Sequence, residues 1–280
     1  HDTLASFAGQ TLTLKWDGAS KTYKGSLTDS NRILSHSSVT SSLPSGLSAS
    51  ISGNTITFTA TKPMDTTAVT LNKNLPELWR TSPLAVLEVT SGTGQEMLCG
   101  QMNDPRSYTM KVRTAQGTAK IIKTSEDGVV SGLQFRVTGN GIDKTYTTDS
   151  KGQITDTIPA GTYTVTEINT PGRYNTPASQ SLTVPDGGTG TVTFSNTLKK
   201  GYVELYKVDT TSDNPLAGAV FGIYNSANIR IGELKTNADG YAKSGLLPYG
   251  DGYYLLEEKA PEGYVPVSYT HLRAHETSAH

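Results

Sequence analysis

Cysteine is almost absent from this chain. Cys99 is the only cysteine among 280 residues, so no disulfide can form within the chain and a cysteine-ligated metal site is not expected. An excess of charge of one sign is also lacking, since 24 Lys and Arg residues balance 25 Asp and Glu residues. The chain therefore has no excess of positive charge that would attract nucleic acid or an anionic membrane surface. We therefore expect neither as a partner.

Long apolar runs are absent as well. No stretch approaches the length of a membrane span, and no signal peptide opens the chain, which begins with His1 instead of methionine. The sequence also lacks a nucleophile elbow, a phosphate-binding loop and any metal-ligand spacing. We expect no enzyme with turnover, no cofactor and no metal site.

Glycine and proline, in contrast, are plentiful, with 28 and 13 residues. They interrupt short runs in which apolar and polar residues alternate, a pattern typical of half-buried strands in a β-sandwich. Within residues 1–114, Ile51 to Phe58 predicts a hairpin, because Ser52, Gly53 and Asn54 separate apolar residues. Leu75 to Trp79 could form one short helical turn. The other runs of this kind lie at 11–16, 68–71, 83–89 and 108–114.

From residue 117 onward the sequence repeats itself with a period of about 84 to 90 residues. KIIKTSED is followed by YTVTEINTPGRY, and ELYKVDTT is followed by YYLLEEKAPEGY. Each copy pairs a strand that carries a lysine, Lys123 or Lys207, with a later strand that carries a glutamate, Glu167 or Glu257. Strand alternation places these lysines and glutamates on the faces that carry the core residues.

A lysine and a glutamate on core faces have chemical consequences. A buried charge is costly unless it is paired, and burial lowers the pKa of an amine and raises the pKa of a carboxyl group. Proton exchange between Lys123 and Glu167 yields a nucleophilic amine beside a carboxylic acid. Such an amine can attack the carboxamide carbon of an asparagine and expel ammonia, and Asn196 in the strand TVTFSNT is the candidate. A buried salt bridge without a covalent bond is the alternative.

The lysine strand, the segment YYLLEEKAPEGY and the closing asparagine resemble the Cna B-type or SpaA-type domains of Gram-positive surface adhesins and pilins. The resemblance covers residues 117–266 and implies an all-β chain of tandem prealbumin-like, Ig-like β-sandwiches. Carried over residue by residue, it implies that Lys123 is the nucleophile, Asn196 the electrophile and Glu167 the proton shuttle of an autocatalytic isopeptide bond. It also implies an extracellular, cell-wall-anchored stalk, which a sortase attaches to peptidoglycan or to a pilus.

The second copy differs from the first in one respect. Lys207 and Glu257 match the motif, but the counterpart of Asn196 would fall beyond residue 280. We therefore expect that this copy cannot complete a cross-link and that it lacks its last strand. Residues 267–277, VSYTHLRAHET, resemble the conceptual translation of a sequencing adapter and contain two of the histidines. The expected domains are 1–114, 115–198 and 199–266, followed by a non-native tail at 267–280.

Residues 1–114 more loosely resemble the β-rich region that follows a thioester domain in such adhesins, through LTDSNRILS, SISGNTITF and DPRSYTMKVRT. Thioester domains join a cysteine to a glutamine, which draws attention to Cys99 and Gln101. Because the family's cysteine lies near the start of its domain and CGQM lies late in this one, we favour a lone thiol. An alternative function is a binding module for a host surface protein or glycan, which predicts an exposed aromatic cluster around Trp16 or Trp79.

Overall fold

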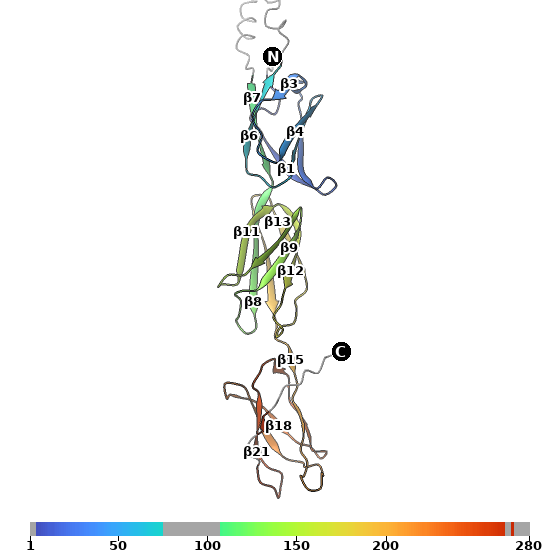
Figure 1. Cartoon of the computed structure of the whole chain (residues 1–280), viewed down its shortest axis with the longest axis vertical. Helices are drawn as coiled ribbons and strands as arrows, with labels where there is room; N and C mark the ends of the chain where they lie inside the picture. The colour runs from blue at the N-terminus through green and yellow to red at the C-terminus, as the bar shows by residue number, and fades with distance from the viewer. Residues whose placement is uncertain (1–3, 75–106, 267–269, 272–280) are drawn as a thin grey trace, which may run out of the picture. The chain divides into compact units, whose positions relative to one another are not determined.

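The chain is built from β-strands that pack as layered sheets (Figure 1). A computed structural model describes residues 4–74, 107–266 and 270–271. By their contacts the residues fall into two compact units, of which the first contains residues up to 123 together with 130–168 and 178–194. The second contains 124–129, 169–177 and the residues from 195 onward. The predicted all-β class is confirmed.

The described residues of the N-terminal sandwich form seven strands in the order β3-β6-β7-β1-β2-β5-β4. Strand β1 changes its partner along its length, because Thr11–Leu14 pairs in parallel with β7 and Lys15–Asp17 pairs antiparallel with β2. This switch divides the strands into two layers, and alternate residues fill the core between them. The elements are β1 (Thr11–Asp17), β2 (Thr22–Thr28), the 3-10 helix η1 (Leu34–His36), β3 (Ser37–Val39), β4 (Leu47–Ser52), β5 (Thr55–Ala60), β6 (Thr67–Lys73) and β7 (Ser107–Thr114).

The hairpin predicted over residues 51–58 is present. Ser52 pairs with Thr55, so Gly53 and Asn54 form a two-residue turn, in which Gly53 adopts a φ of 58°. The runs at 11–16, 68–71 and 108–114 lie in β1, β6 and β7. The helical turn predicted at 75–79 and the run at 83–89 lie outside the described residues.

Asp29 ties the N-terminal segment of this sandwich to the loop after β2. Its buried carboxylate accepts backbone N–H groups from four residues, which are Ser6 at 2.7 Å, Ile33 at 2.7 Å, Leu34 at 2.9 Å and Asn31 at 3.1 Å. Burial by itself raises the pKa of Asp29, but the N–H groups of Ser6, Leu34 and Asn31 stabilise the carboxylate more strongly, so its pKa lies below the ordinary value.

The first repeat is a second sandwich, with sheet orders β10-β9-β12-β13 and β11-β8-β14. Its core includes Phe135, Val165 and Phe194, which are fully buried. The period-two patterns of β8, β12 and β14, in which every second residue is buried, produce this arrangement. The strands are β8 (Gln116–Ser125), β9 (Gln134–Gly139), β10 (Ile142–Thr147), β11 (Gln153–Pro159), β12 (Gly161–Ile168), β13 (Gln180–Val184) and β14 (Thr189–Asn196).

The second repeat follows the same plan, but one of its sheets lacks a strand among the described residues. Its sheet β18-β17-β21-β22 repeats the order β10-β9-β12-β13, and the pair β16-β19 corresponds to β8-β11. Within the described part of the chain, no strand takes the place of β14 beside β16. The strands are β15 (Lys200–Gly201), β16 (Glu204–Tyr206), β17 (Val220–Tyr224), β18 (Arg230–Lys235), β19 (Tyr241–Lys243), β20 (Leu247–Pro248), β21 (Tyr254–Lys259) and β22 (Thr270–His271).

The expected tail at 267–280 lies mostly outside the described residues. Its residues 270 and 271 form β22, which pairs with Tyr254 and Leu255 of β21. The non-native character of the tail stays a prediction, as do the domain boundaries. Among the described residues, no helix has the length and apolar character that a membrane crossing requires.

Candidate functional site

Lys123 and Glu167 meet inside the first repeat. Lys123 lies near the end of β8 and Glu167 near the end of β12, on strands of the two facing sheets. Lys123 Nζ lies 3.9 Å from Glu167 Oε1, and both side chains are 0% exposed. The Lys123 ammonium also donates to the carbonyl oxygen of Phe194 at 3.5 Å. Both groups therefore lie on the core faces of their strands, as strand alternation predicted.

Two buried phenylalanines lie beside this pair. Phe135 lies directly opposite Glu167 in the register of β9 and β12, and its ring centroid is 5.0 Å from that of Phe194. Phe135 and Phe194 are both fully buried. Water is thus kept from the lysine and the carboxylate, and each of them depends on the other and on nearby backbone groups to compensate for lost hydration.

Asn196 is the last residue of β14 and is 1% exposed. It follows Phe194 by two positions, so strand alternation puts both side chains on the inner face. Its backbone carbonyl accepts the N–H of Glu126 at 2.9 Å. On the outer face, the hydroxyl groups of Thr124 and Ser195 lie 2.7 Å apart. These bonds join the strand that ends at Asn196 to the residues that follow Lys123.

The second repeat contains the same pair in a wetter setting. Lys207 Nζ lies 3.5 Å from Glu257 Oε1, and the Glu257 side chain is 1% exposed. The Lys207 side chain, however, is 21% exposed, against 0% for Lys123. The difference in lysine exposure follows from the neighbouring strands. Strand β8 lies between β11 and β14, whereas β16 has β19 as its one neighbour among the described strands.

Tyr174, the last residue of the segment YTVTEINTPGRY, makes a contact that was not predicted from the sequence. In the first repeat, Tyr174 donates from its hydroxyl to Asp127 Oδ1 at 2.6 Å, and Arg173 donates to Asp127 Oδ2 at 2.9 Å. Burial raises the pKa of Asp127, and the bonds from Tyr174 and Arg173 more than reverse this. The loop after β12 is thereby fastened to the loop after β8.

The same contact recurs in the second repeat. Tyr264 donates from its hydroxyl to Asp209 Oδ2 at 2.5 Å. That bond and the N–H groups of Ser212 and Thr211 lower the pKa of Asp209 to about 2. The signal was present in the sequence, since PGRY and PEGY both end in tyrosine and an aspartate follows each lysine within four residues.

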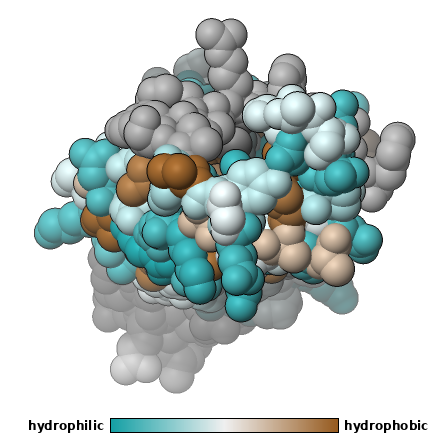
Figure 2. Space-filling view, turned by 90° about the horizontal axis from the view of Figure 1, so that it is seen from below, coloured by the Kyte–Doolittle hydropathy of each residue, from teal (hydrophilic) through white to brown (hydrophobic). Residues whose placement is uncertain are grey.

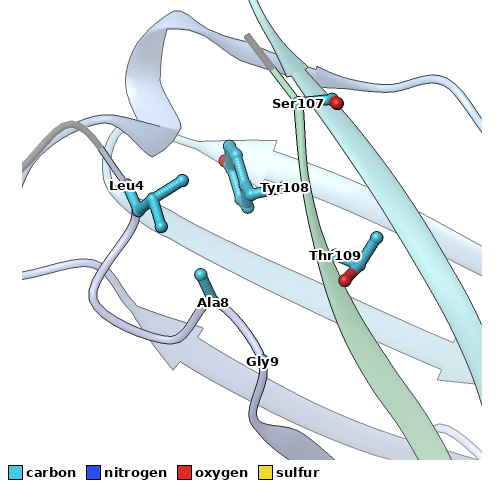
Figure 3. A pocket seen from close by; sticks show the side chains of 6 residues that line it. All are labelled: Leu4, Ala8, Gly9, Ser107, Tyr108 and Thr109. Carbon is cyan, nitrogen blue, oxygen red and sulfur yellow. The ribbon is translucent and has the colours of Figure 1, made fainter. Parts of the chain in front are cut away.

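The other candidate surfaces lie away from these residues. An open pocket in the N-terminal sandwich contains none of Lys123, Glu167 and Asn196 (Figure 3). Figure 2 shows a mostly hydrophilic face on which hydrophobic residues lie in small, separate groups. In the described part of the chain, no group of three or more His, Cys, Asp or Glu side chains could hold a metal ion. The pocket is lined by Leu4, Ala8, Gly9, Ser107, Tyr108 and Thr109.

The aromatic cluster expected for a host-binding module is not found at Trp16. Its side chain is half-buried, packs against the core of the N-terminal sandwich, and lies 5.1 Å from the ring of Tyr23 between centroids. Trp79 lies outside the described residues, as do Cys99 and Gln101, so the lone-thiol interpretation stays a prediction.

Comparison with known proteins gives a family match. The model of a family described as SpaA, prealbumin-like fold domain, matches twice, at residues 117–198 and 201–272. Together these matches cover more than half of the chain. The trypsin-resistant surface T6 protein of Streptococcus pyogenes serotype M6 is 41% identical over 83 residues, which are 29% of this chain and 15% of that protein.

Among solved structures, one shares the fold at low identity. The Bacillus anthracis TIE protein has a TM-score of 0.54 and 21% identity, over 93% of this chain and 52% of its own. The streptococcal ancillary pilin covers 82% of this chain and 76% of its own, with 18% identity and a TM-score of 0.29. The chain thus spans about half of the Bacillus protein and a smaller part of the T6 protein.

Proposed function

The chain belongs to the family of SpaA prealbumin-like fold domains, of which it carries two in tandem, and from this premise we propose that it is a stalk segment of a Gram-positive surface adhesin or pilus subunit. In this role the chain lies outside the cell, and a sortase attaches its parent protein to peptidoglycan or to a pilus. The stalk holds a region that binds a host surface protein or glycan away from the cell.

An isopeptide bond between Lys123 and Asn196 stabilises this stalk. The neutral Lys123 amine attacks Asn196 Cγ, the new Nζ–Cγ bond forms, and the Cγ–Nδ2 bond breaks. Nδ2 leaves as ammonia after it receives a proton, and Glu167 carries protons between the attacking and the leaving nitrogen. Glu167 ends in its starting state, so the reaction needs no cofactor. It occurs once in each molecule and is not enzymatic turnover.

The observation that carries the proposal is the sealed environment of Lys123 and Glu167. Both side chains are 0% exposed and lie 3.9 Å from each other, in a repeat whose core contains the fully buried Phe135 and Phe194. Transfer of one proton from the ammonium to the carboxylate removes both buried charges and leaves the amine as a nucleophile. Lys207, at 21% side-chain exposure, lies partly in contact with solvent.

Intact-mass spectrometry of the purified chain tests the bond. We expect a mass that is lower than the sequence mass by one ammonia, and a branched peptide that joins Lys123 to Asn196 after digestion. Lys123→Arg should restore the full mass, since a guanidinium is not a nucleophile, and Lys207→Arg is the matched control that should leave the loss unchanged. A full mass for the unaltered chain, or a loss that survives Lys123→Arg, contradicts the proposal.

A further inference from the structure

The first unit contains a junction without a linker. Strand β7 ends at Thr114 and β8 begins at Gln116, so Ala115 is the one residue between the N-terminal sandwich and the first repeat. Ala115 is 3% exposed. Its N–H donates to the carbonyl of Leu14, and its own carbonyl accepts the N–H of Ala160, both at 2.9 Å. The crossing residue is therefore bonded to both domains through its backbone.

The carboxylate of Asp186 accepts several hydrogen bonds beside this junction. Asp186, between β13 and β14, receives both terminal nitrogens of Arg113, at 2.9 and 2.5 Å, and the N–H of Gln116 at 3.1 Å. Arg113 also donates to Thr13 in β1 at 3.1 Å. The bidentate contact is the strong geometry for a guanidinium and a carboxylate, and Arg113 holds the pKa of Asp186 below its ordinary value.

Aromatic residues of the N-terminal sandwich rest on a turn of the first repeat. The Tyr23 hydroxyl donates to the carbonyl of Asn140 at 2.7 Å, across 117 residues of sequence. Trp16 fills the space over Gly141 so closely that a Cβ on that glycine would lie 2.6 Å from Trp16 Cζ3. Gly141 also has a φ of 79°, so both its conformation and its close approach favour glycine.

We propose that these contacts form a preformed rigid joint, in which Asp186 clamps the crossing strand and the aromatic pair Trp16 and Tyr23 braces the turn at Asn140–Gly141. Relative motion is the default for neighbouring domains that share only a small interface. Here backbone hydrogen bonds, an ion pair and an aromatic contact link the two domains at three separate places. The joint is independent of the Lys123–Asn196 bond, so a negative mass measurement leaves it unaffected.

The second unit shows the same use of a carboxylate. Glu126 accepts the N–H of Leu198 at 2.8 Å and pairs with the Lys200 ammonium at 2.8 Å. Lys200 in turn pairs with Pro248 in the sheet of the second repeat. One carboxylate of the first repeat thus holds a backbone N–H and a cation of the connecting segment, as Asp186 does in the first unit.

Distances between spin labels in the full chain test the joint. Labels are placed on Ser50→Cys and Thr155→Cys, at exposed strand positions on either side of the joint, in a chain that carries Cys99→Ser. We expect one narrow distance distribution. Asp186→Asn should make it at least about twofold wider, because the ion pair no longer restrains the two domains. Arg113→Gln removes the same pair from the other partner and should widen the distribution as well.

Asp143→Asn is the matched control. It removes the bidentate ion pair between Arg136 and Asp143, at 2.9 and 2.8 Å, which lies within β9 and β10 and does not cross the joint. Its distribution should stay as narrow as that of the parent chain, and circular dichroism checks that each variant is folded. A broad distribution in the parent chain, an unchanged width in both joint variants, or equal widening in the control overturns the proposal.

Discussion

A double variant, Lys123→Met with Glu167→Gln, separates a covalent bond from a buried salt bridge in the first repeat. The two substitutions remove both charged groups together, so neither is left buried without its partner. Both side chains are 0% exposed, and methionine and glutamine have volumes close to those they replace. The variant therefore changes the charge pair and the cross-link while leaving the packing of the core nearly intact.

The two hypotheses predict different stabilities for this variant. A bond from residue 123 to residue 196 closes a loop on the order of 70 residues, and loss of such a closure costs about 4 kcal/mol in the chain-entropy relation for cross-links. A salt bridge alone predicts no loss, because uncharged replacements of a buried ion pair are often neutral or stabilising. The single variant Lys123→Met should be worse than the double variant, since Glu167 then stays buried alone.

Native-state hydrogen exchange measures this difference inside one repeat, where a global melting curve would mix several domains. If the bond exists, backbone amides of β8 and β12 should exchange roughly a thousandfold faster in the double variant, since each 1.4 kcal/mol is about a factor of ten. Lys207→Met with Glu257→Gln is the matched control and should leave β8 and β12 unchanged. Unaltered exchange of β8 in the first double variant would refute the covalent hypothesis.

Three further predictions concern single contacts. Tyr174→Phe removes the donor to Asp127 and should lower the stability of the first repeat by about 1–2 kcal/mol, measured by amide exchange, while Tyr264→Phe should cost less because that residue is 45% exposed. Asp29→Ala leaves four backbone N–H groups without their acceptor and should lower the stability of the N-terminal sandwich by at least about 3 kcal/mol, measured by amide exchange of its strands. The folded pKa of Asp29 lies below its ordinary value, so its contribution to stability is present above pH of about 4 and disappears as pH falls through the folded pKa. The stability of the alanine variant should therefore depend less steeply on pH. An equally steep dependence would contradict this. Gly141→Ala should weaken the joint by more than about 1 kcal/mol, because φ is positive and an aromatic ring occupies the space.

The alternation of apolar and polar residues was the most informative pattern in the sequence. It predicted the core-facing positions of Lys123 and Glu167, because the side chains of a strand point alternately to its two faces, while the turn residues Ser52 to Asn54 predicted the hairpin at 51–58. It could not predict the partner switch of β1 between Leu14 and Lys15, since that depends on which strands lie beside β1. The contact between Tyr23 and Asn140 was equally out of reach, because no local pattern links residues so far apart in sequence.

The two repeats show how a neighbouring strand decides what a motif can do. YYLLEEKAPEGY and YTVTEINTPGRY occupy the same place in the two copies, yet the lysine of the first copy is the less exposed of the two. The motif fixes which residues lie on the inner face, and in both copies it brings a lysine within 4 Å of a glutamate. Burial of the lysine depends on whether its strand has a second neighbour in the sheet. For the strand of Lys123, β8, that second neighbour is β14. A strand supplied beside β16 should therefore dehydrate Lys207 and give the second pair the environment of the first.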